Sequence, residues 1–245
     1  MDVVPARSGG ELRQSGSVGS REGSSTMNMN PPPLVEAVHA GDAQLVRLLL
    51  EQGRDVNEAV RGFTALHAAV TYGNSEIVQI LRAIPGINAN PEMDDDMTPL
   101  YLAAHLGRAD QVQLLLEFPG IDVNHASVDG MTPLLAASER GHVGVVRLLL
   151  AHQDVDVNRA NSAGFAALLL ALRGGKYDVM RLLIASERVN VNLPFTSGAT
   201  ALHLASQQGV VEAVQILERK RIRKRKRKRA APPPSLTCLS TAMPS

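Results

Sequence analysis

The stretch TPLYLAA at residues 98–104 decides the fold, because related versions of it recur along the chain at intervals of 34 residues. The versions are TALHAA at 64–69, TPLLAA at 132–137, AALLLA at 166–171 and TALHLA at 200–205. A weaker copy begins at Pro32. Self-similarity at one fixed period of this size predicts an array of small units, each packed on its neighbours.

Each unit has the signals of two helices. The threonine that opens a block can cap a helix through its hydroxyl, and proline at the next position suits the first helical turn. A glycine nine residues after each block start predicts the left-handed end of that helix. These glycines are Gly73, Gly107, Gly141, Gly175 and Gly209. A second segment with helical apolar spacing follows, as in LVRLLL at 45–50, and then an extended turn such as Asp122-Val123-Asn124. Two short helices cannot bury their apolar faces alone, so the units are expected to stack into one continuous core.

The block, the glycine and a recurring asparagine stay in register over about residues 31–218. The asparagines are Asn57, Asn90, Asn124, Asn158 and Asn192. This pattern resembles the ankyrin repeat, with its Thr-Pro-Leu-His-x-Ala-Ala block, following glycine and Asp-Val-Asn turn. The resemblance implies an all-α fold, an ankyrin-repeat solenoid of stacked helix–turn–helix units with hairpin fingers on one side and disordered termini. The sequence departs from the family pattern at Ala166 and Ala167, which replace Thr and Pro, so this unit is expected to be the loosest. The last unit does not reach its Asp-Val-Asn turn.

The organisation of the chain follows from these repeats and from shifts in composition. Residues 1–30 are rich in Gly and Ser and are expected to be disordered, and residues 31–218 are predicted to form the repeat domain. The six predicted units are approximately 31–59, 60–92, 93–126, 127–160, 161–194 and 195–218. A basic run at 219–229 follows, and 230–245 is predicted to be a disordered tail rich in Pro, Ser and Thr.

The net charge of +1 hides a strong asymmetry. Residues 31–218 hold twelve basic and twenty-one acidic side chains, a charge of −9, whereas ten of the eleven residues at 219–229 are Lys or Arg. Like charges repel, so this run is expected to be solvated, mobile and helical for no more than its first turn, with Pro232-Pro233-Pro234 stopping any helix. The candidate basic residues are Lys220, Arg221, Arg223, Lys224, Arg225, Lys226, Arg227, Lys228 and Arg229.

Several interpretations of the basic run stay open. It is long enough for a nuclear-import signal, and it could bind nucleic acid or an acidic membrane without specificity through counterion release. It lacks the aromatic side chains that stack bases, which weakens the case for single-stranded nucleic acid. It could instead be low-complexity sequence that truncates the array, or it could fold back on the acidic repeat domain.

The residues do not form a pattern typical of catalysis or metal binding. The sequence has no Gly-rich phosphate loop, no Gly-x-Ser-x-Gly elbow and no His-Glu-x-x-His. A single cysteine, Cys238, excludes a disulfide framework and a cysteine-built zinc site. The ankyrin resemblance implies that His67 and His203, at the fourth position of the block, are structural, and the other histidines share no metal spacing. We therefore expect no enzyme activity, no metal and no cofactor.

Asp94-Asp95-Asp96 falls on the predicted finger between the second and third units. A calcium site is excluded, because no glutamate stands at the loop-closing position and no glycine makes the sharp turn. The run is then either a solvated finger tip or an acidic contact for a basic partner. Charged surface residues are common, which favours the solvated tip.

Two sets of positions are candidates for binding a partner. The residue before the block start is large and apolar at Phe63, Met97, Met131 and Phe165, and the resemblance places it where the finger meets the inner helix, on the concave side. Four such groups in a row either form an interaction surface or pack on their own fingers and stay half exposed. The positions just before each glycine vary within the constant frame, as expected where a repeat scaffold encodes the choice of partner. They include Thr71, Tyr72, His105, Leu106, Glu139, Arg140, Arg173, Gln207 and Gln208.

The sequence therefore predicts a protein–protein interaction scaffold or adaptor that binds another protein on its concave inner-helix and finger surface, with the basic run as a candidate nuclear-import signal. The alternative is nucleic-acid or anionic-lipid binding through that run. No small-molecule substrate is expected, and the protein is expected to be monomeric. No apolar run approaches the ~18 residues of a membrane span, and no secretory leader is expected, so the predicted location is intracellular, in the cytoplasm, the nucleus or both.

Overall fold

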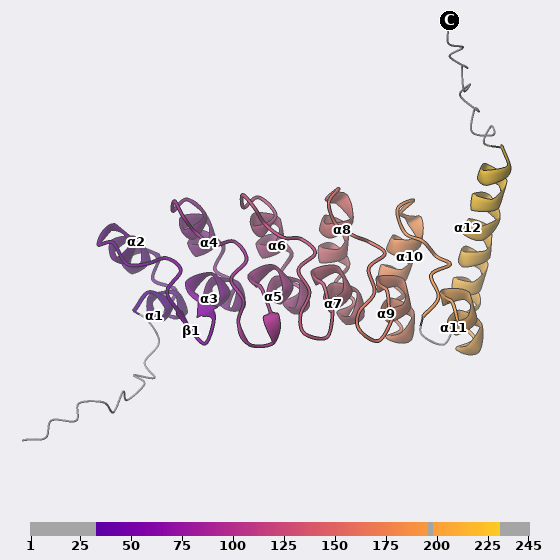
Figure 1. Ribbon diagram of the computed structural model, residues 1–245, viewed down its shortest axis with the longest axis horizontal. Helices are drawn as coiled ribbons and strands as arrows, with labels where there is room; N and C mark the ends of the chain where they lie inside the picture. Colours follow the sequence, from indigo (N-terminus) through magenta and orange to yellow (C-terminus); the bar gives the residue numbers. More distant parts are fainter. Residues whose placement is uncertain (1–32, 196–197, 231–245) are drawn as a thin grey trace, which may run out of the picture. The chain divides into compact units, whose positions relative to one another are not determined.

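The computed structural model describes residues 33–195 and 198–230, with the side chains of 224–230 left out, and these residues form twelve α-helices that alternate between two layers (Figure 1). The inner helices are α1 (Pro33–His39), α3 (Ala65–Tyr72), α5 (Pro99–Leu106), α7 (Pro133–Arg140), α9 (Ala167–Arg173) and α11 (Ala201–Gln207). The outer helices are α2 (Ala43–Glu51), α4 (Ser75–Arg82), α6 (Ala109–Leu115), α8 (Val143–Ala151), α10 (Tyr177–Ala185) and α12 (Val211–Ala230).

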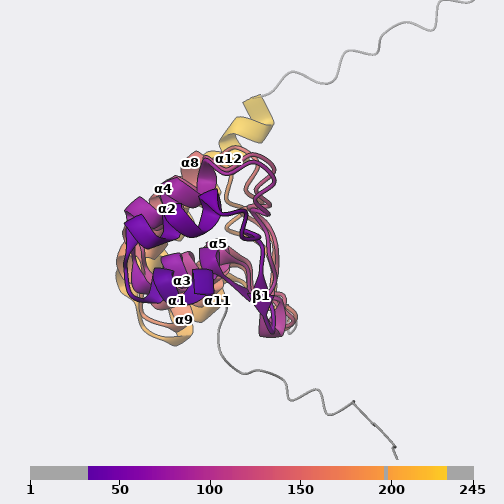
Figure 2. The same ribbon diagram turned by 90° about the vertical axis from the view of Figure 1, so that its left-hand side faces the viewer.

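The helices pack as a row of antiparallel pairs. Each inner helix contacts the inner helix of the next pair, and each outer helix contacts the next outer helix. Figure 2 looks along this row and shows the inner helices superimposed in one layer, the outer helices in a second and the fingers beside the inner layer. The stacked helix–turn–helix architecture predicted from the 34-residue period is therefore confirmed.

The predicted helix signals act as expected in α3, α5 and α7. The hydroxyls of Thr64, Thr98 and Thr132 each accept a hydrogen bond from the backbone N–H three residues on, at 3.3–3.4 Å. Glycine ends these helices in the left-handed conformation, as at Gly107 with φ 74°. A side chain there would also collide with a neighbour, since an added Cβ would lie 2.5 Å from the His142 imidazole. The glycine is thus required by both backbone and packing.

The core runs between the two layers. Inner helices contribute leucine and alanine that are fully shielded from solvent, such as Leu66, Leu100 and Ala103, and the small alanines let neighbouring helices approach closely. Outer helices contribute one buried apolar stripe each, for example Ile77 and Leu81 of α4. Each fully buried leucine stabilises the fold by ~1.5–3 kcal/mol relative to an exposed one.

The fingers connect each outer helix to the next inner helix. One of them is a short hairpin in which β1 (Ala59–Val60) pairs with β2 (Phe63–Thr64) in antiparallel register. Beside the fingers the repeating asparagines tie successive pairs together. The Asn90 amide donates to the Gly120 carbonyl at 2.8 Å, and its oxygen accepts from the Asp122 N–H at 2.7 Å. Asn57, Asn124 and Asn158 make the same two contacts, so this ladder satisfies loop backbone that the helices leave unpaired.

The structure corrects the expectation for the basic run. We predicted helix for no more than the first turn of this run, but α12 continues through it from Val211 to Ala230. The mobility of the run stays a prediction. Lys and Arg are good helix formers, and adding a residue to an existing helix gains one hydrogen bond without a new nucleus. Lys220 also anchors the helix, since its Nζ donates to the Ile184 and Ser186 carbonyls at the end of α10. Pro232-Pro233-Pro234, which are predicted to stop any helix, lie outside the described residues.

Three further expectations from the sequence concern the chain termini, the unit with Ala166 and membrane spans. Disorder was predicted for residues 1–30 and 230–245, and of these only Ala230, the last residue of α12, lies among the described residues. The unit with Ala166 at its N-cap has no side-chain cap on α9, and its relative looseness stays a prediction. Among the described helices, none combines the length and the apolar character needed to cross a membrane.

Candidate functional site

The predicted apolar stripe lies on the finger side of the inner helices, which we call the inner face. Phe63, Met97, Met131 and Phe165 are all half-buried. The Phe63 ring stacks on His67 at 5.7 Å between centroids, and Phe165 stacks on Phe195 at 5.4 Å. Each stripe residue therefore packs on the frame with one part and reaches solvent with the other.

The variable positions form a second row on the inner face, at the carboxyl ends of the inner helices. Tyr72 and Leu106 are 49% and 42% exposed, which is high for large apolar side chains. Arg140, Arg173, Gln207 and Gln208 are exposed as well, whereas Thr71, His105 and Glu139 are half-buried. Tyr and Arg are the residue types most often found as anchors in protein interfaces.

Contacts between successive helices connect this second row. Tyr72 packs on His39 at 4.6 Å between ring centroids, and Arg173 pairs with Glu139 at 3.4 Å. The Arg140 guanidinium donates to Nε2 of His105 at 3.0 Å. Side chains on neighbouring repeats thus hold each other in place instead of moving independently.

His105 is neutral in this arrangement. Burial lowers the pKa of His105, and the positive charge of Arg140 lowers it further. Because Nε2 accepts a hydrogen bond, the ring proton is assigned to Nδ1. The surface there presents one fixed cation beside an uncharged imidazole.

Arg173 joins the two rows. Its guanidinium carbon lies 4.7 Å from the centroid of the Phe165 ring, a cation–π distance. The same side chain pairs with Glu139 of the preceding helix. The stripe and the variable row therefore form one continuous surface at this point.

Thr71 makes hydrogen bonds within its own helix and to the next repeat. Its hydroxyl donates to the His67 carbonyl at 2.8 Å, and its own carbonyl accepts from Arg108 at 3.3 Å. His142 makes the corresponding contact one unit on, donating from Nε2 to the His105 carbonyl at 3.0 Å. This role of Arg108 and His142 was not predicted from the sequence. The available signal was their 34-residue spacing, immediately after the glycine that ends each inner helix.

His67 has the structural role that the resemblance implied. It is fully buried, its Nδ1 accepts from the Thr64 N–H at 3.3 Å, and its Nε2 donates to the Met97 carbonyl of the next unit at 3.1 Å. Burial lowers its pKa to about 4, so the ring is uncharged at neutral pH. His203 makes the same local contact with Thr200 at 3.1 Å but is exposed.

The three aspartates of the second finger are exposed, and they form a short 3-10 turn, η1 (Asp94–Asp96). Asp94 pairs with Arg61 of the preceding finger at 3.0 Å. Throughout residues 33–195 and 198–230, no three His, Cys, Asp or Glu side chains come close enough together to hold a metal ion.

The basic residues lie on α12. Arg223 is exposed and Arg221 half-buried, and Lys220 is tied to the end of α10. The backbone of residues 224–229 continues the helix, and the side chains from Lys224 to Arg229 lie outside the described part. The basic run and the inner face are therefore carried by different elements, α12 and the inner helices.

Comparisons with known proteins agree with the repeat pattern. The family described as Ankyrin repeats (3 copies) matches residues 19–93, 82–161 and 153–228. An ankyrin repeat domain from Acinetobacter baumannii AYE is 30% identical, with a TM-score of 0.71 over 77% of this chain and 97% of its own. No curated protein sequence matches.

Two further solved structures are similar. The ankyrin repeat protein EF0377 is 30% identical, with a TM-score of 0.70 over 76% of this chain and 96% of its own. The ankyrin repeat domain of Bcl-3, described as a unique member of the IkappaB protein family, is 27% identical with a TM-score of 0.70, over 77% of this chain and 86% of its own. Ankyrin repeat domains generally mediate protein–protein interaction and are typically non-enzymatic. The family match spans most of the sequence, and the chain belongs to the ankyrin repeat family.

Proposed function

We propose that this protein is a non-enzymatic scaffold that binds a protein partner on its inner face, with each of the six helix pairs acting as one repeat. The observation that carries the proposal is a row of exposed side chains at matching positions of consecutive inner helices, Tyr72, Leu106 and Arg140, of which the tyrosine and the arginine are anchor types. The half-buried stripe beside them adds apolar area.

Rigid presentation is the proposed mechanism. The cross-repeat contacts of Tyr72, Arg140 and Arg173 order these side chains before a partner arrives. Ordering a flexible side chain on binding costs about 0.5–1.5 kcal/mol, so a surface that is already ordered retains more of its contact energy as affinity. No step of this mechanism needs a cofactor, a metal or a small-molecule substrate.

The experiment is a matched pair of tyrosine substitutions. A partner is first captured with the full chain, and its affinity is then measured for Tyr72→Ala and for Tyr177→Ala. Both tyrosines are exposed, at 49% and 40%, but Tyr177 begins an outer helix. Tyr72→Ala is expected to weaken binding about tenfold or more, and Tyr177→Ala to change it little. Equal effects would place the binding surface elsewhere.

The apolar stripe is tested separately. The triple variant Phe63→Ala, Met97→Ala and Met131→Ala is expected to weaken the same complex, because it removes apolar contact area from three consecutive repeats. Circular dichroism gives the helical content as a control. A triple variant that is unfolded would show that these side chains belong to the core and not to the binding surface.

The basic run supports a second proposal, that α12 directs the protein to the nucleus. Among residues 219–229 only Ile222 is not Lys or Arg, so the extension of α12 is cationic along its whole length and has no apolar face. An apolar face is what an interfacial membrane helix needs, which weighs against insertion into lipid. Fusing residues 211–230 to an inert reporter tests the proposal, since a reporter that stays in the cytosol would reject it. Binding to nucleic acid through the run predicts a steep fall in affinity with salt.

A further inference from the structure

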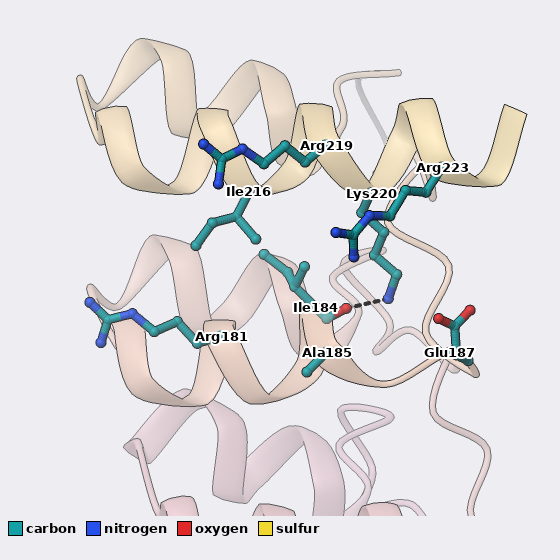
Figure 3. A pocket seen from close by; sticks show the side chains of 8 residues that line it. All are labelled: Arg181, Ile184, Ala185, Glu187, Ile216, Arg219, Lys220 and Arg223. Carbon is teal, nitrogen blue, oxygen red and sulfur yellow. Dashed lines mark hydrogen bonds between the residues drawn. The ribbon is translucent and has the colours of Figure 1, made fainter. Parts of the chain in front are cut away.

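A groove opens between α10 and α12, on the outer layer and away from the inner face. Its volume is about 450 Å³, within the range of ~300–1,000 Å³ typical of small-molecule sites. Figure 3 shows Ile184 of α10 and Ile216 of α12 facing each other across it. Lys220 closes one side by reaching from α12 to the Ile184 carbonyl.

Four cationic side chains line this groove, and two of them are held by the fold. Arg181 makes two hydrogen bonds to Glu212, at 2.8 and 2.7 Å, and a third to Asp178 at 2.7 Å. Lys220 donates to the carbonyls of Ile184 and Ser186. These contacts fix the spacing of α10 and α12, and the Lys220 ammonium offsets the negative end of the α10 dipole.

Arg219 and Arg223 are the two that remain. They are four residues apart, so they lie one above the other on the same face of α12. Both are exposed, and neither forms an ion pair with any residue that the structure describes. Figure 3 shows the Arg223 guanidinium beside the groove and next to Lys220, and the Arg219 side chain extending along α12 above Ile216. The fork of an arginine matches two oxygens of a phosphate group.

The charge of the lining favours an anion. Glu187 is the single carboxylate that lines the groove. Together with Glu212 and Asp178, which both pair with Arg181, it makes three negative charges against the four cations Arg181, Arg219, Lys220 and Arg223, so one positive charge is in excess. A phosphate monoester, which carries about −1.5 to −2 at neutral pH, has the sign that this excess attracts.

The floor of the groove is apolar. Ile184, Ala185 and Ile216 lie between the cationic side chains, and apolar walls strengthen an ionic contact by excluding water. We propose that this groove binds a phosphorylated small molecule or headgroup, with Arg219 and Arg223 holding the phosphate and the two isoleucines contacting the organic part. This site is independent of the protein-binding inner face.

Calorimetric titration of the full chain tests the proposal with three probes. They are inorganic phosphate, inositol trisphosphate, and phosphatidylcholine vesicles with and without a phosphoinositide. Inositol trisphosphate is expected to bind more tightly than inorganic phosphate, because one of its phosphates can occupy the site while its ring adds contacts to the groove. Tighter binding to the phosphoinositide vesicles than to the soluble trisphosphate assigns the site to a lipid headgroup, and the reverse order assigns it to a soluble metabolite.

Single substitutions distinguish binding in the groove from binding to the net charge of the basic run. Arg219→Gln and Arg223→Gln are each expected to weaken inositol trisphosphate binding about tenfold, the effect of losing a charge-assisted hydrogen bond. Arg221→Gln is the matched control, because Arg221 lies on the same helix but does not line the groove, and it should change the affinity less than about twofold. Glu187→Gln is expected to strengthen binding by removing the one opposing carboxylate.

Two results would overturn the proposal. The first is the absence of measurable binding to any of the three probes. The second is an equal loss of affinity in Arg219→Gln, Arg221→Gln and Arg223→Gln, which would show binding to the net charge of the basic run. Circular dichroism of each variant establishes that α12 remains helical.

Discussion

The blocks at 64–69 and 200–205 have nearly the same sequence and the same local contacts but differ in burial. In both, the histidine Nδ1 accepts from the threonine N–H, at 3.3 Å for His67 and 3.1 Å for His203. Yet His67 is fully buried and His203 is exposed, and Leu66 is fully buried whereas Leu202 is only partly so. The cap therefore depends on the local sequence, whereas burial depends on what packs against each block.

The difference lies in the neighbours. Helix α3 packs between α1 and α5 in the inner layer, and the Met97 carbonyl of the following unit accepts from His67. Helix α11 packs on α9 on one side and is the last inner helix of the described row. In a repeat array each unit is stabilised largely by the interface with the next, so the terminal unit lacks one such interface.

The largest expected effect contrasts two equivalent leucines. Leu66→Ala removes a fully buried side chain and is expected to lower the free energy of unfolding by ~2–5 kcal/mol. Leu202→Ala is expected to cost clearly less, because part of its surface is already in water. Urea unfolding of both variants checks this. Equal losses would mean that the terminal unit is as tightly packed as the interior.

The next effect is a loss of folding stability at acid pH. The pKa of His67 is about 4 in the folded protein against 6.5 ordinarily. As the pH falls from 6.5 toward 4, the unfolded chain binds a proton at this residue and the folded chain does not, so stability is lost across that window. The shift corresponds to roughly 3 kcal/mol between pH 7 and pH 4.

Two measurements check this acid effect. Urea unfolding from pH 7 to pH 4 gives the loss of stability, and His67→Gln should make that loss smaller. NMR gives the titration of the His67 ring directly. A ring that titrates near 6.5 in the folded state would contradict the burial described for it.

The same contrast shows how much the sequence could predict. Helix starts at Thr64, Thr98 and Thr132 and the left-handed glycines could be predicted, because caps and turns depend on residues a few positions apart. The half-exposed state of the apolar stripe could not be decided. It depends on how far each finger covers its own inner helix, which no spacing within the repeat specifies.

The contacts that reach back to the preceding unit were harder still to predict from the sequence. Arg108, His142 and Lys220 all donate to carbonyls at helix ends some 34–37 residues earlier. Their role depends on the offset between stacked helices. For the same reason the basic run was predicted to be helical for no more than its first turn, since its charge is visible in the sequence and the anchor at Lys220 is not.

A smaller effect is expected where one interior cap is missing. Thr132 caps α7, whereas Ala166 at the same position leaves α9 without a side-chain cap. Thr132→Ala is expected to cost ~1 kcal/mol, and Ala166→Thr to gain up to about as much. Thr64, Thr98 and Thr132 are nearly fully buried at the equivalent position, so the repeat frame accommodates a threonine there in other units. Thermal unfolding of both variants checks the prediction, and a destabilising Ala166→Thr would show that this unit packs differently from its neighbours.

The smallest expected effect concerns the hydrogen bonds from Lys220 to the Ile184 and Ser186 carbonyls, which link α12 to the end of α10. Lys220→Met keeps the length of the side chain but removes the ammonium that caps the α10 carbonyls, and is expected to cost ~1 kcal/mol or less. Arg221→Met is the control on the same helix. Because Lys220 lies in the basic run, loss of its hydrogen bonds should also let the end of α12 unwind. Lys220→Met should therefore lower the helical signal in circular dichroism more than Arg221→Met does. Equal signals in the two variants would mean that the basic run is helical through the propensity of its Lys and Arg residues and does not depend on the Lys220 hydrogen bonds.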